Sequence, residues 1–269
     1  MLLGMRIEFM KMQGLGNDFL VFDAAAIAAD TPLDERTLRA LADRHTGVGF
    51  DQALMLESPR DPASRVFYRI FNSDGTEVEQ CGNGARCIAA LLYARAPELG
   101  RDFIMSSPGG RVRARVRDDG LVSVDMGIPE FEEPFEFSLK IESKDITMSA
   151  LSLGNPHAVL RVPDVKTAPV ELWGPSIQRH PHFPNRANVS FIMPVDANTI
   201  DVRFYERGAG ETMSSGTGST GAAVAAVARG MAQSPVRVLT PAGPLDIRIE
   251  DEVFLTGPAE IVGEGEFFL

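Results

Sequence analysis

Residues 71–87 read FNSDGTEVEQCGNGARC, and residues 205–221 read YERGAGETMSSGTGSTG. Aligned on their glycines, Cys81-Gly82-Asn83-Gly84 matches Ser215-Gly216-Thr217-Gly218. The two turns lie 134 residues apart, from 81 to 215, which is about half of the 269-residue chain. A Gly-rich turn repeated at half the chain length predicts two similar halves. The copies differ at one chemically important position, because Cys81 in the first corresponds to Ser215 in the second.

The agreement between the halves extends well beyond these turns. Each half contains a Leu-Gly-Asn tripeptide, one near the start of the chain and one just past its middle, followed by a helix-like segment and a strand-like run. After the turn come an Ala-rich helical stretch and a passage of alternating polar and apolar residues. The matched segments are, in chain order, 15–17 with 153–155, 33–45 with 170–180, 65–71 with 199–205, 87–96 with 222–232, and 103–127 with 236–258. Chance similarity is the alternative, and five matches in one order argue against it.

Many strands with one or two helices in each half predict an α+β fold with two pseudo-symmetric halves. The boundary is expected near Gly127–Glu133, where the chain is Pro-rich and acidic. We predict an N-terminal half at 1–127 that carries the first turn and a C-terminal half at 128–260 that carries the second. A last strand at 261–269 is expected to complete the N-terminal half.

The composition limits the kind of protein. A hydrophobic content of 44% with 23% charged residues is ordinary for a globular protein in water. The net charge of −11 argues against nucleic acid or an anionic membrane as a partner. Two cysteines are too few for a disulfide scaffold and favour a reducing, cytoplasmic location. The expected partner is therefore a small molecule.

Each turn joins a strand to a helix, and this arrangement favours the binding of an anion. The first backbone N–H groups of a helix lack partners and lie at the positive end of the helix dipole. Glycines let the backbone approach a carboxylate closely. The same helix start stabilises a thiolate, so we expect the pKa of Cys81 to lie below its usual value of about 8.5. Such a thiolate can remove a proton next to a bound carboxylate.

Two such turns facing each other would hold one carboxylate between two helix starts. Residues 81 and 215 would then lie on opposite faces of the bound α-carbon, which is the geometry for inversion by two bases. One group would remove the proton and the other would supply one from behind. The alternative is that both sequences are only tight turns, and their symmetric repetition favours the reactive site.

Other reactive groupings are weak. His180-Pro181-His182 lacks the spacing of a metal site, so no metal is expected. Gly14-Leu15-Gly16 lacks the helix and the acidic residue of a dinucleotide site. Cys87 is expected in the core. Glu206 and Arg207 lie next to the second turn and could bind an ammonium and a carboxylate.

Six motifs, in order, resemble those of the diaminopimelate epimerase family across nearly the whole chain. They are KMQGLGNDF at 11–19, RHTGVGFDQ at 44–52, FNSDGTEVEQCGNGARC at 71–87, SLGNPHAV at 152–159, HFPNRANVSF at 182–191 and ERGAGETMSSGTG at 206–218. The resemblance implies an enzyme without a cofactor that interconverts LL- and meso-diaminopimelate for lysine and peptidoglycan synthesis. It implies two halves, each a strongly curved, mostly antiparallel sheet wrapped around a central helix. A cytoplasmic homodimer is also expected.

The resemblance implies a role for each matched residue. Cys81 would be one of two acid–base residues, and His157 would lie near the reacting centre. The reacting carboxylate would be held by the backbone of Gly82, Asn83, Gly216 and Thr217. The proximal end of the substrate would be lined by Asn17 and Gln52. Its distal amino-acid head would be bound by Asn72, Asn155, Asn188, Glu206 and Arg207.

Ser215 departs from the family, which has its second catalytic cysteine there. A hydroxyl is a weaker acid than a thiol and is rarely a useful base near neutral pH unless a neighbour activates it. The chain is then a natural epimerase with a Cys/Ser pair, a form altered from Cys to stop turnover, or an enzyme of related chemistry. Such chemistry includes hydroxyproline dehydratases and other amino-acid racemases, and an amino-acid-binding protein without turnover is the alternative outside enzymes. The distal residues favour diaminopimelate, because a proline-like substrate has no second charged head.

Overall fold

The computed structural model describes residues 5–27 and 33–269. The chain forms two compact units, one of Met1–Val124 with Pro258–Leu269 and the other of Asp125–Gly257. The sequence prediction placed both boundaries three residues later, at 127 and 260. The acidic, Pro-rich segment expected at the boundary contains the start of a strand, β9, at Glu130.

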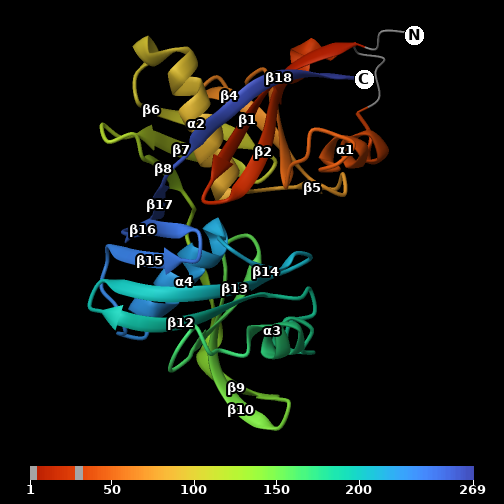
Figure 1. Cartoon of the computed structure of the whole chain (residues 1–269). Helices are drawn as coiled ribbons and strands as arrows, with labels where there is room; N and C mark the ends of the chain where they lie inside the picture. The colour runs from red at the N-terminus through yellow and green to blue at the C-terminus, as the bar shows by residue number, and fades with distance from the viewer. Residues whose placement is uncertain (1–4, 28–32) are drawn as a thin grey trace. The chain divides into compact units, whose positions relative to one another are not determined.

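The first unit is a sheet wrapped around one long helix, α2 (Gly82–Arg95), with a short helix, α1 (Glu35–Ala42), beside it. Two 3₁₀ turns lie at Ala24–Ala26 and Pro97–Leu99. Helix α2 contacts the first strand of the chain, β1, and the last, β18, as well as β7 (Figure 1). The strands are β1 (Arg6–Gly14), β2 (Asn17–Asp23), β3 (Gln52–Glu57), β4 (Ser64–Asn72), β5 (Glu77–Val78), β6 (Asp102–Ser107), β7 (Gly110–Val116), β8 (Val122–Asp125) and β18 (Glu260–Phe268).

The second unit repeats this plan around α4 (Gly216–Ala228), with α3 (Val170–Gln178) as its short helix. Figure 1 shows α4 behind the strands β12, β13 and β15 that cover it. The strands are β9 (Glu130–Ile141), β10 (Lys144–Ser152), β11 (Pro156–Arg161), β12 (Asn188–Asp196), β13 (Thr199–Glu206), β14 (Gly210–Thr212), β15 (Val236–Thr240), β16 (Gly243–Ile249) and β17 (Val253–Gly257).

The two units share one strand topology. In the first unit β2 pairs parallel with β3 and β4 with β6; in the second, β11 pairs parallel with β12 and β13 with β15. The other equivalent pairs, such as β3 with β4 and β12 with β13, are antiparallel. The C-terminal strand β18 pairs with β1 as β9 pairs with β10, so residues from the end of the chain complete the first unit (Figure 1). The predicted α+β fold with two pseudo-symmetric halves is confirmed.

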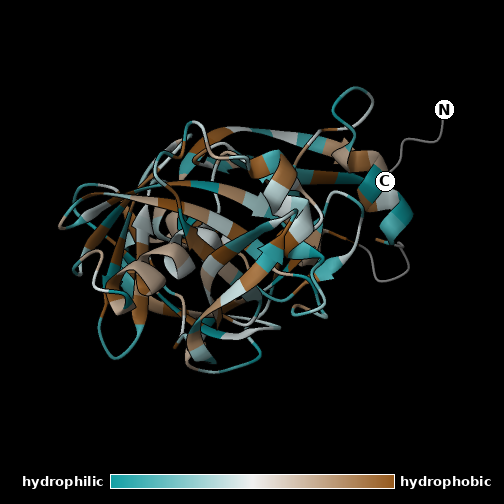
Figure 2. Cartoon of the chain, turned by 90° about the horizontal axis from the view of Figure 1, so that it is seen from below, coloured by the Kyte–Doolittle hydropathy of each residue, from teal (hydrophilic) through white to brown (hydrophobic). Residues whose placement is uncertain are grey.

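The burial pattern explains why these segments form strands and Ala-rich helices. Strand β7 alternates exposed and buried residues, because one face meets water and the other meets the core. Figure 2 shows the same alternation as hydrophilic and hydrophobic bands along the strands. Helix α4 is buried nearly all round, so it needs small side chains. A Cβ at Gly221 would lie 3.4 Å from the ring of His157, which shows how closely this helix packs.

The central helices begin earlier than the Ala-rich stretches predicted, at Gly82 and Gly216 instead of 87 and 222. The glycines of each turn therefore form the first helical turn. Glycine has low helix propensity, which is why composition alone misses these starts. In the described part of the chain, no helix is long and apolar enough to cross a membrane.

Candidate active site

Cys81 and Ser215 occupy the same structural position in their units. Cys81 is the N-cap of α2, with φ −148° and ψ 111°, and its Sγ accepts a hydrogen bond from Gly84 N at 3.4 Å. Ser215 is the N-cap of α4, with φ −141° and ψ 124°, and its Oγ accepts one from Gly218 N at 3.1 Å. Each unit therefore places one polarisable side chain at the positive end of its central helix.

The fourth residue of each turn is a glycine that packs closely against its surroundings. A Cβ at Gly84 would lie 3.1 Å from Leu54, and one at Gly218 would lie 2.9 Å from Phe204. These glycines let the helix start lie close against a buried strand. These two glycines thus serve close packing, and the predicted approach of the turn backbone to a ligand stays a prediction.

In the first unit, a chain of amides runs beside the helix start. Asn83 is buried, and its Nδ2 donates to Asn17 Oδ1 at 3.4 Å. Asn17 Nδ2 in turn donates to Asp51 Oδ2 at 3.1 Å. Asp51 also accepts a hydrogen bond of 2.8 Å from Arg44, which bridges to Asp18. The ion pairs with Arg44 and Lys11 lower the pKa of Asp18 to about 2 against the opposing effect of burial.

Gln52 and Asn72 contact each other, although the resemblance assigned them to opposite ends of the substrate. Gln52 Nε2 donates to Asn72 Oδ1 at 3.0 Å, since the two residues are paired across β3 and β4. Gln52 Oε1 is buried and has no hydrogen-bond partner among the described residues. That oxygen is available to accept a hydrogen bond from a ligand donor.

In the second unit, Ser215 is hydrogen-bonded to a partly buried acid, Glu206. Ser215 Oγ donates to Glu206 Oε2 at 2.7 Å, and Thr212 Oγ1 donates to Glu206 Oε1 at 2.6 Å. Burial raises the pKa of Glu206 above its ordinary value, and the two hydroxyl donors only partly oppose this effect. The carboxylate of Glu206 is thus hydrogen-bonded to Ser215, the residue whose reactivity the sequence left in question.

His157 is fully buried and neutral. Burial, with a smaller effect of the Arg207 charge, lowers its pKa to about 3. Its Nε2 lies 2.8 Å from Asn155 Oδ1, and Asn155 Nδ2 donates to Thr217 Oγ1 at 3.4 Å. Because Asn155 offers its oxygen, the imidazole carries its proton on Nε2, and Nδ1 is an acceptor. Nδ1 has no hydrogen-bond partner among the described residues.

Two further residues of the predicted set lie nearby. Asn188 Oδ1 accepts a hydrogen bond of 2.9 Å from the backbone N–H of Arg207, which fixes the chain after β13. Asn188 is paired with His157 across β11 and β12, as Gln52 is paired with Phe19 across β2 and β3. The Arg207 guanidinium donates to Asn185 O at 3.2 Å. Glu206 and Arg207 thus have different hydrogen-bond partners within the unit, and their predicted binding of an ammonium and a carboxylate stays a prediction.

Sequence reasoning missed the residues that hold these side chains in place. Asp51 orients Asn17, and Thr212 holds the second oxygen of Glu206. Arg86 donates to Asn83 Oδ1 at 2.9 Å from within the core. All three stand inside the quoted motifs, but only the folded contacts assign them a role. Among the described residues, no group of three His, Cys, Asp or Glu side chains is placed to hold a metal ion.

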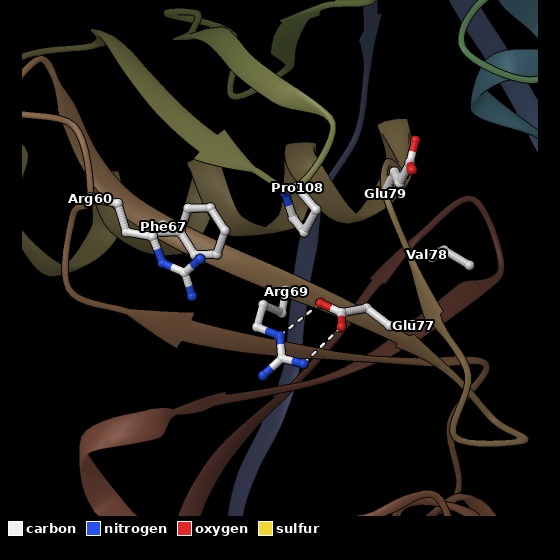
Figure 3. Close-up of a pocket in the computed structure, with 7 residues that line it drawn as sticks. All are labelled: Arg60, Phe67, Arg69, Glu77, Val78, Glu79 and Pro108. Carbon is white, nitrogen blue, oxygen red and sulfur yellow. Dashed lines mark hydrogen bonds and ion pairs between the residues drawn. The ribbon is translucent and has the colours of Figure 1, made fainter.

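A surface pocket in the first unit contains none of the predicted site residues (Figure 3). Its lining is Arg60, Phe67, Arg69, Glu77, Val78, Glu79 and Pro108. Arg69 donates to both oxygens of Glu77 at 2.7 Å, as the dashed lines in Figure 3 mark. Arg60 pairs with Glu57 at 2.6 Å and lies over the Phe67 ring. Because both guanidinium groups already have acidic partners, the pocket offers no unpaired cation to a ligand.

The two helix starts supply complementary chemistry. The first offers a thiol with amides beside it, and the second offers a hydroxyl bonded to a partly buried carboxylate, with a neutral imidazole of β11 packed against the same helix. Backbone N–H groups at each start can bind a carboxylate. Such groups suit proton transfer at a carbon next to a carboxylate.

The chain matches the family model described as diaminopimelate epimerase over residues 9–132 and 149–262. It is 44% identical to the diaminopimelate epimerase of Pseudomonas syringae pv. tomato, over 97% of this chain and 99% of that protein. It is 46% identical to the diaminopimelate epimerase of Aromatoleum aromaticum, with the same coverage of both chains.

Solved structures share the fold at low sequence identity. A hydroxyproline epimerase from Agrobacterium vitis, with bound trans-4-hydroxy-L-proline, has a TM-score of 0.74 and 17% identity, covering 98% of this chain and 93% of that one. A phenazine biosynthesis protein of the PhzF family from Bacillus anthracis has a TM-score of 0.73 and 16% identity, covering 98% and 99%. These two structures support the α+β fold described above.

Proposed function

Because the chain belongs to the diaminopimelate epimerase family, we propose that it interconverts LL- and meso-diaminopimelate by proton transfer at one α-carbon. The reaction serves lysine biosynthesis. The relatives named for this substrate match at 44–46% identity over nearly their whole length, whereas the hydroxyproline epimerase matches at 17%. Diaminopimelate is therefore favoured over a proline-like substrate.

The observation that carries the proposal is the equivalence of Cys81 and Ser215. Both are N-caps of the central helix of their unit, with nearly the same backbone angles. We propose that Cys81 removes the α-proton in one direction and that Ser215 protonates the carbanion. The backbone at Gly82, Asn83, Gly216 and Thr217 would bind the carboxylate next to the reacting carbon and stabilise the charge that develops there.

Glu206 supplies the neighbour that a serine needs. A serine hydroxyl becomes an effective base when an adjacent group takes its proton. In the direction in which Ser215 acts as base, Oγ would accept the α-proton while its own proton passes to Glu206 Oε2, 2.7 Å away. In the other direction Glu206 returns the proton to Oγ as Ser215 protonates the carbon. The raised pKa of Glu206 suits this exchange, because the carboxylate then takes up a proton at a pH closer to neutral.

The remaining predicted residues would bind the rest of the substrate. Gln52 Oε1 and His157 Nδ1, both buried acceptors with no partner among the described residues, could each accept from an ammonium group. The Arg207 guanidinium could bind the distal carboxylate. The others of this set are Asn17, Asn72, Asn155 and Asn188.

We also propose that the protein is a cytoplasmic homodimer. Ile261 and Val262 on β18 are 46% and 62% exposed, and neighbouring exposed apolar side chains can form part of a protein–protein contact. A second copy covering them would remove this surface from water. Light scattering coupled to gel filtration tests the dimer, and Val262→Lys is expected to shift the population to monomer.

Incubation with LL-diaminopimelate in deuterated water tests the function. Proton NMR is expected to show loss of the α-proton signal, and chromatography is expected to show the meso isomer. Exchange without the meso isomer would indicate that Cys81 works alone. Binding of the substrate without any exchange would rule out epimerisation, and trans-3- and trans-4-hydroxy-L-proline serve as the comparison substrates.

A further inference from the structure

Arg86 is a buried cation for which the described residues supply no acidic partner. Its side chain is fully buried within the first unit, in the middle of α2. Nη1 donates to Asn83 Oδ1 at 2.9 Å, and Nε donates to Pro258 O at 3.2 Å. Among the described residues, Nη2 has no hydrogen-bond partner and no carboxylate forms an ion pair with the guanidinium. Buried charges in proteins are normally paired, so the position calls for an explanation.

The guanidinium remains charged in spite of its burial. Burial lowers its pKa to about 10, which still leaves it protonated at neutral pH. The groups whose ionisation favours this charge are the two thiols of the chain, Cys81 and Cys87. Burial raises the pKa of Cys87 to about 12, so that thiol stays neutral. Cys81, which is partly exposed at the helix start, is the thiol that can carry the matching negative charge.

Arg86 also sets the direction of the amides beside Cys81. Because Arg86 occupies Asn83 Oδ1, the Asn83 amide must direct its Nδ2 at Asn17 Oδ1. Asn17 must then direct its own Nδ2 at Asp51. Arg86 is a donor at one end of this series of hydrogen bonds, and the Asp51 carboxylate is an acceptor at the other. Each amide between them therefore has a single orientation.

We propose that Arg86 is a positioning residue for the proton transfer. It orients Asn83 and Asn17, and its charge compensates the negative charge that gathers at the start of α2 when Cys81 is ionised and a substrate carboxylate is bound. This inference rests on the function proposed above. The competing role is structural: the hydrogen bond to Pro258 would only tie the start of the C-terminal segment to α2.

Arg86→Met separates the two roles, because methionine fills much of the same space without charge or donors. The variants are made with Cys87→Ala, so that Cys81 is the only cysteine and iodoacetamide reports on its thiolate. The alkylation rate at pH 7 is expected to fall about tenfold, as a rise of one unit in the thiol pKa requires. kcat is expected to fall about 10- to 100-fold with a smaller change in KM, because the amides are no longer oriented. The thermal midpoint is expected to stay level or rise, because an unpaired buried charge is removed.

Arg95→Met is the matched control, on the same helix, where the arginine is exposed to solvent and paired with Asp23. It is expected to leave alkylation and kcat unchanged. A lower thermal midpoint in Arg86→Met with an unchanged alkylation rate and unchanged kcat would overturn the proposal in favour of the structural role. If Arg86→Met does not fold, Arg86→Lys distinguishes the two roles. Lysine keeps the positive charge but cannot reproduce the guanidinium's paired hydrogen bonds to Asn83 and Pro258. Alkylation near the wild-type rate with kcat reduced about tenfold supports positioning, and an unchanged kcat overturns it.

The alkylation and melting measurements need no substrate. A failure of this inference is therefore distinguishable from a failure of the proposed function, which only the exchange of diaminopimelate reports.

Discussion

The hydroxyl of Ser215 donates a 2.7 Å hydrogen bond to Oε2 of Glu206, a partly buried carboxyl group at the end of β13. Glu206 lies nine residues before Ser215, and the intervening turn with β14 brings the two side chains together. The pair has no counterpart in the first unit, where β4 ends in the neutral Asn72 and the helix cap is a thiol. A thiol ionises by itself near neutral pH, whereas a hydroxyl needs a base. The unit whose helix cap is a thiol thus has a neutral residue at the end of the strand, and the unit whose cap is a hydroxyl has an acid there.

Cys81→Ala is expected to abolish α-proton exchange, by about a thousandfold or more, because no other described group at the start of α2 has a thiol's acidity. Exchange of LL-diaminopimelate in deuterated water measures the effect. Cys87→Ala is the control, since the Cys87 thiol is buried and neutral, and it should exchange within about twofold of wild type. Residual exchange in Cys81→Ala at the wild-type rate would contradict the proposed base.

Ser215→Cys is expected to raise turnover by about one to three orders of magnitude, because a thiol is a better proton donor and base than a hydroxyl. Initial rates in both directions measure it. Ser214→Cys places the same thiol one residue earlier and should leave the rate unchanged. An equal or lower rate in Ser215→Cys would point to an enzyme whose chemistry depends on the Ser215–Glu206 pair.

Glu206→Gln is expected to slow strongly the step in which Ser215 is the base, because an amide cannot take the hydroxyl proton, and to remove the pH dependence that the carboxyl group gives to that step. Only the ionised carboxylate accepts a proton, so wild-type activity in that direction should fall as the pH drops through the raised pKa of Glu206, above 4.5. Stability changes in the opposite sense. An acid with a raised pKa in the folded state binds protons more tightly there, so its contribution to stability is lost as the pH rises. The rate and the free energy of unfolding in urea are measured against pH for wild type and Glu206→Gln. Parallel stability curves for the two proteins would contradict the raised pKa of Glu206 in the folded state.

His157 is expected to stay neutral from pH 4 to 9. Its pKa is lowered to about 3 in the folded state and is about 6.5 in the unfolded chain. The unfolded chain therefore binds the extra proton first, and stability is lost as the pH falls from 6.5 toward 3, by at most about 1.4 kcal/mol per pH unit. Imidazole NMR shifts measure the titration directly. His157→Asn should flatten the loss of stability, whereas His45→Asn, at an exposed position, should retain it.

Phe267→Ala is expected to destabilise the first unit by about 3–5 kcal/mol, because it empties a core position on the last strand. Phe267 is 4% exposed and its ring meets that of Phe22 edge-on at 5.6 Å. Phe268→Ala is the neighbouring control, at 56% exposure, and should change stability by less than about 0.5 kcal/mol. Urea unfolding measures both, and equal effects would show that β18 contributes little to the core.

The sequence alone predicted the elements whose signals are local. The repeated turns, the alternation at 103–127 and 236–258, and the apolar spacing at 33–45 and 170–180 each reflect a period imposed by one strand or one helix. The repeat at half length predicted two halves of one topology, because each half must bury its own Ala-rich helix. Helix starts were the exception, since glycines within the first turn hide them.

Only the tertiary structure decided which side chains meet and in what charge state. Three hydrogen bonds depend on strand register and helix packing, which no short stretch of sequence encodes. They join Ser215 to Glu206, Gln52 to Asn72, and Arg86 to Asn83. The neutrality of His157 and the raised pKa of Glu206 arise from loss of water around them, a property of the assembled core. Local periodicity therefore determined the architecture, while burial and pairing between distant residues decided the chemistry that each helix start can perform.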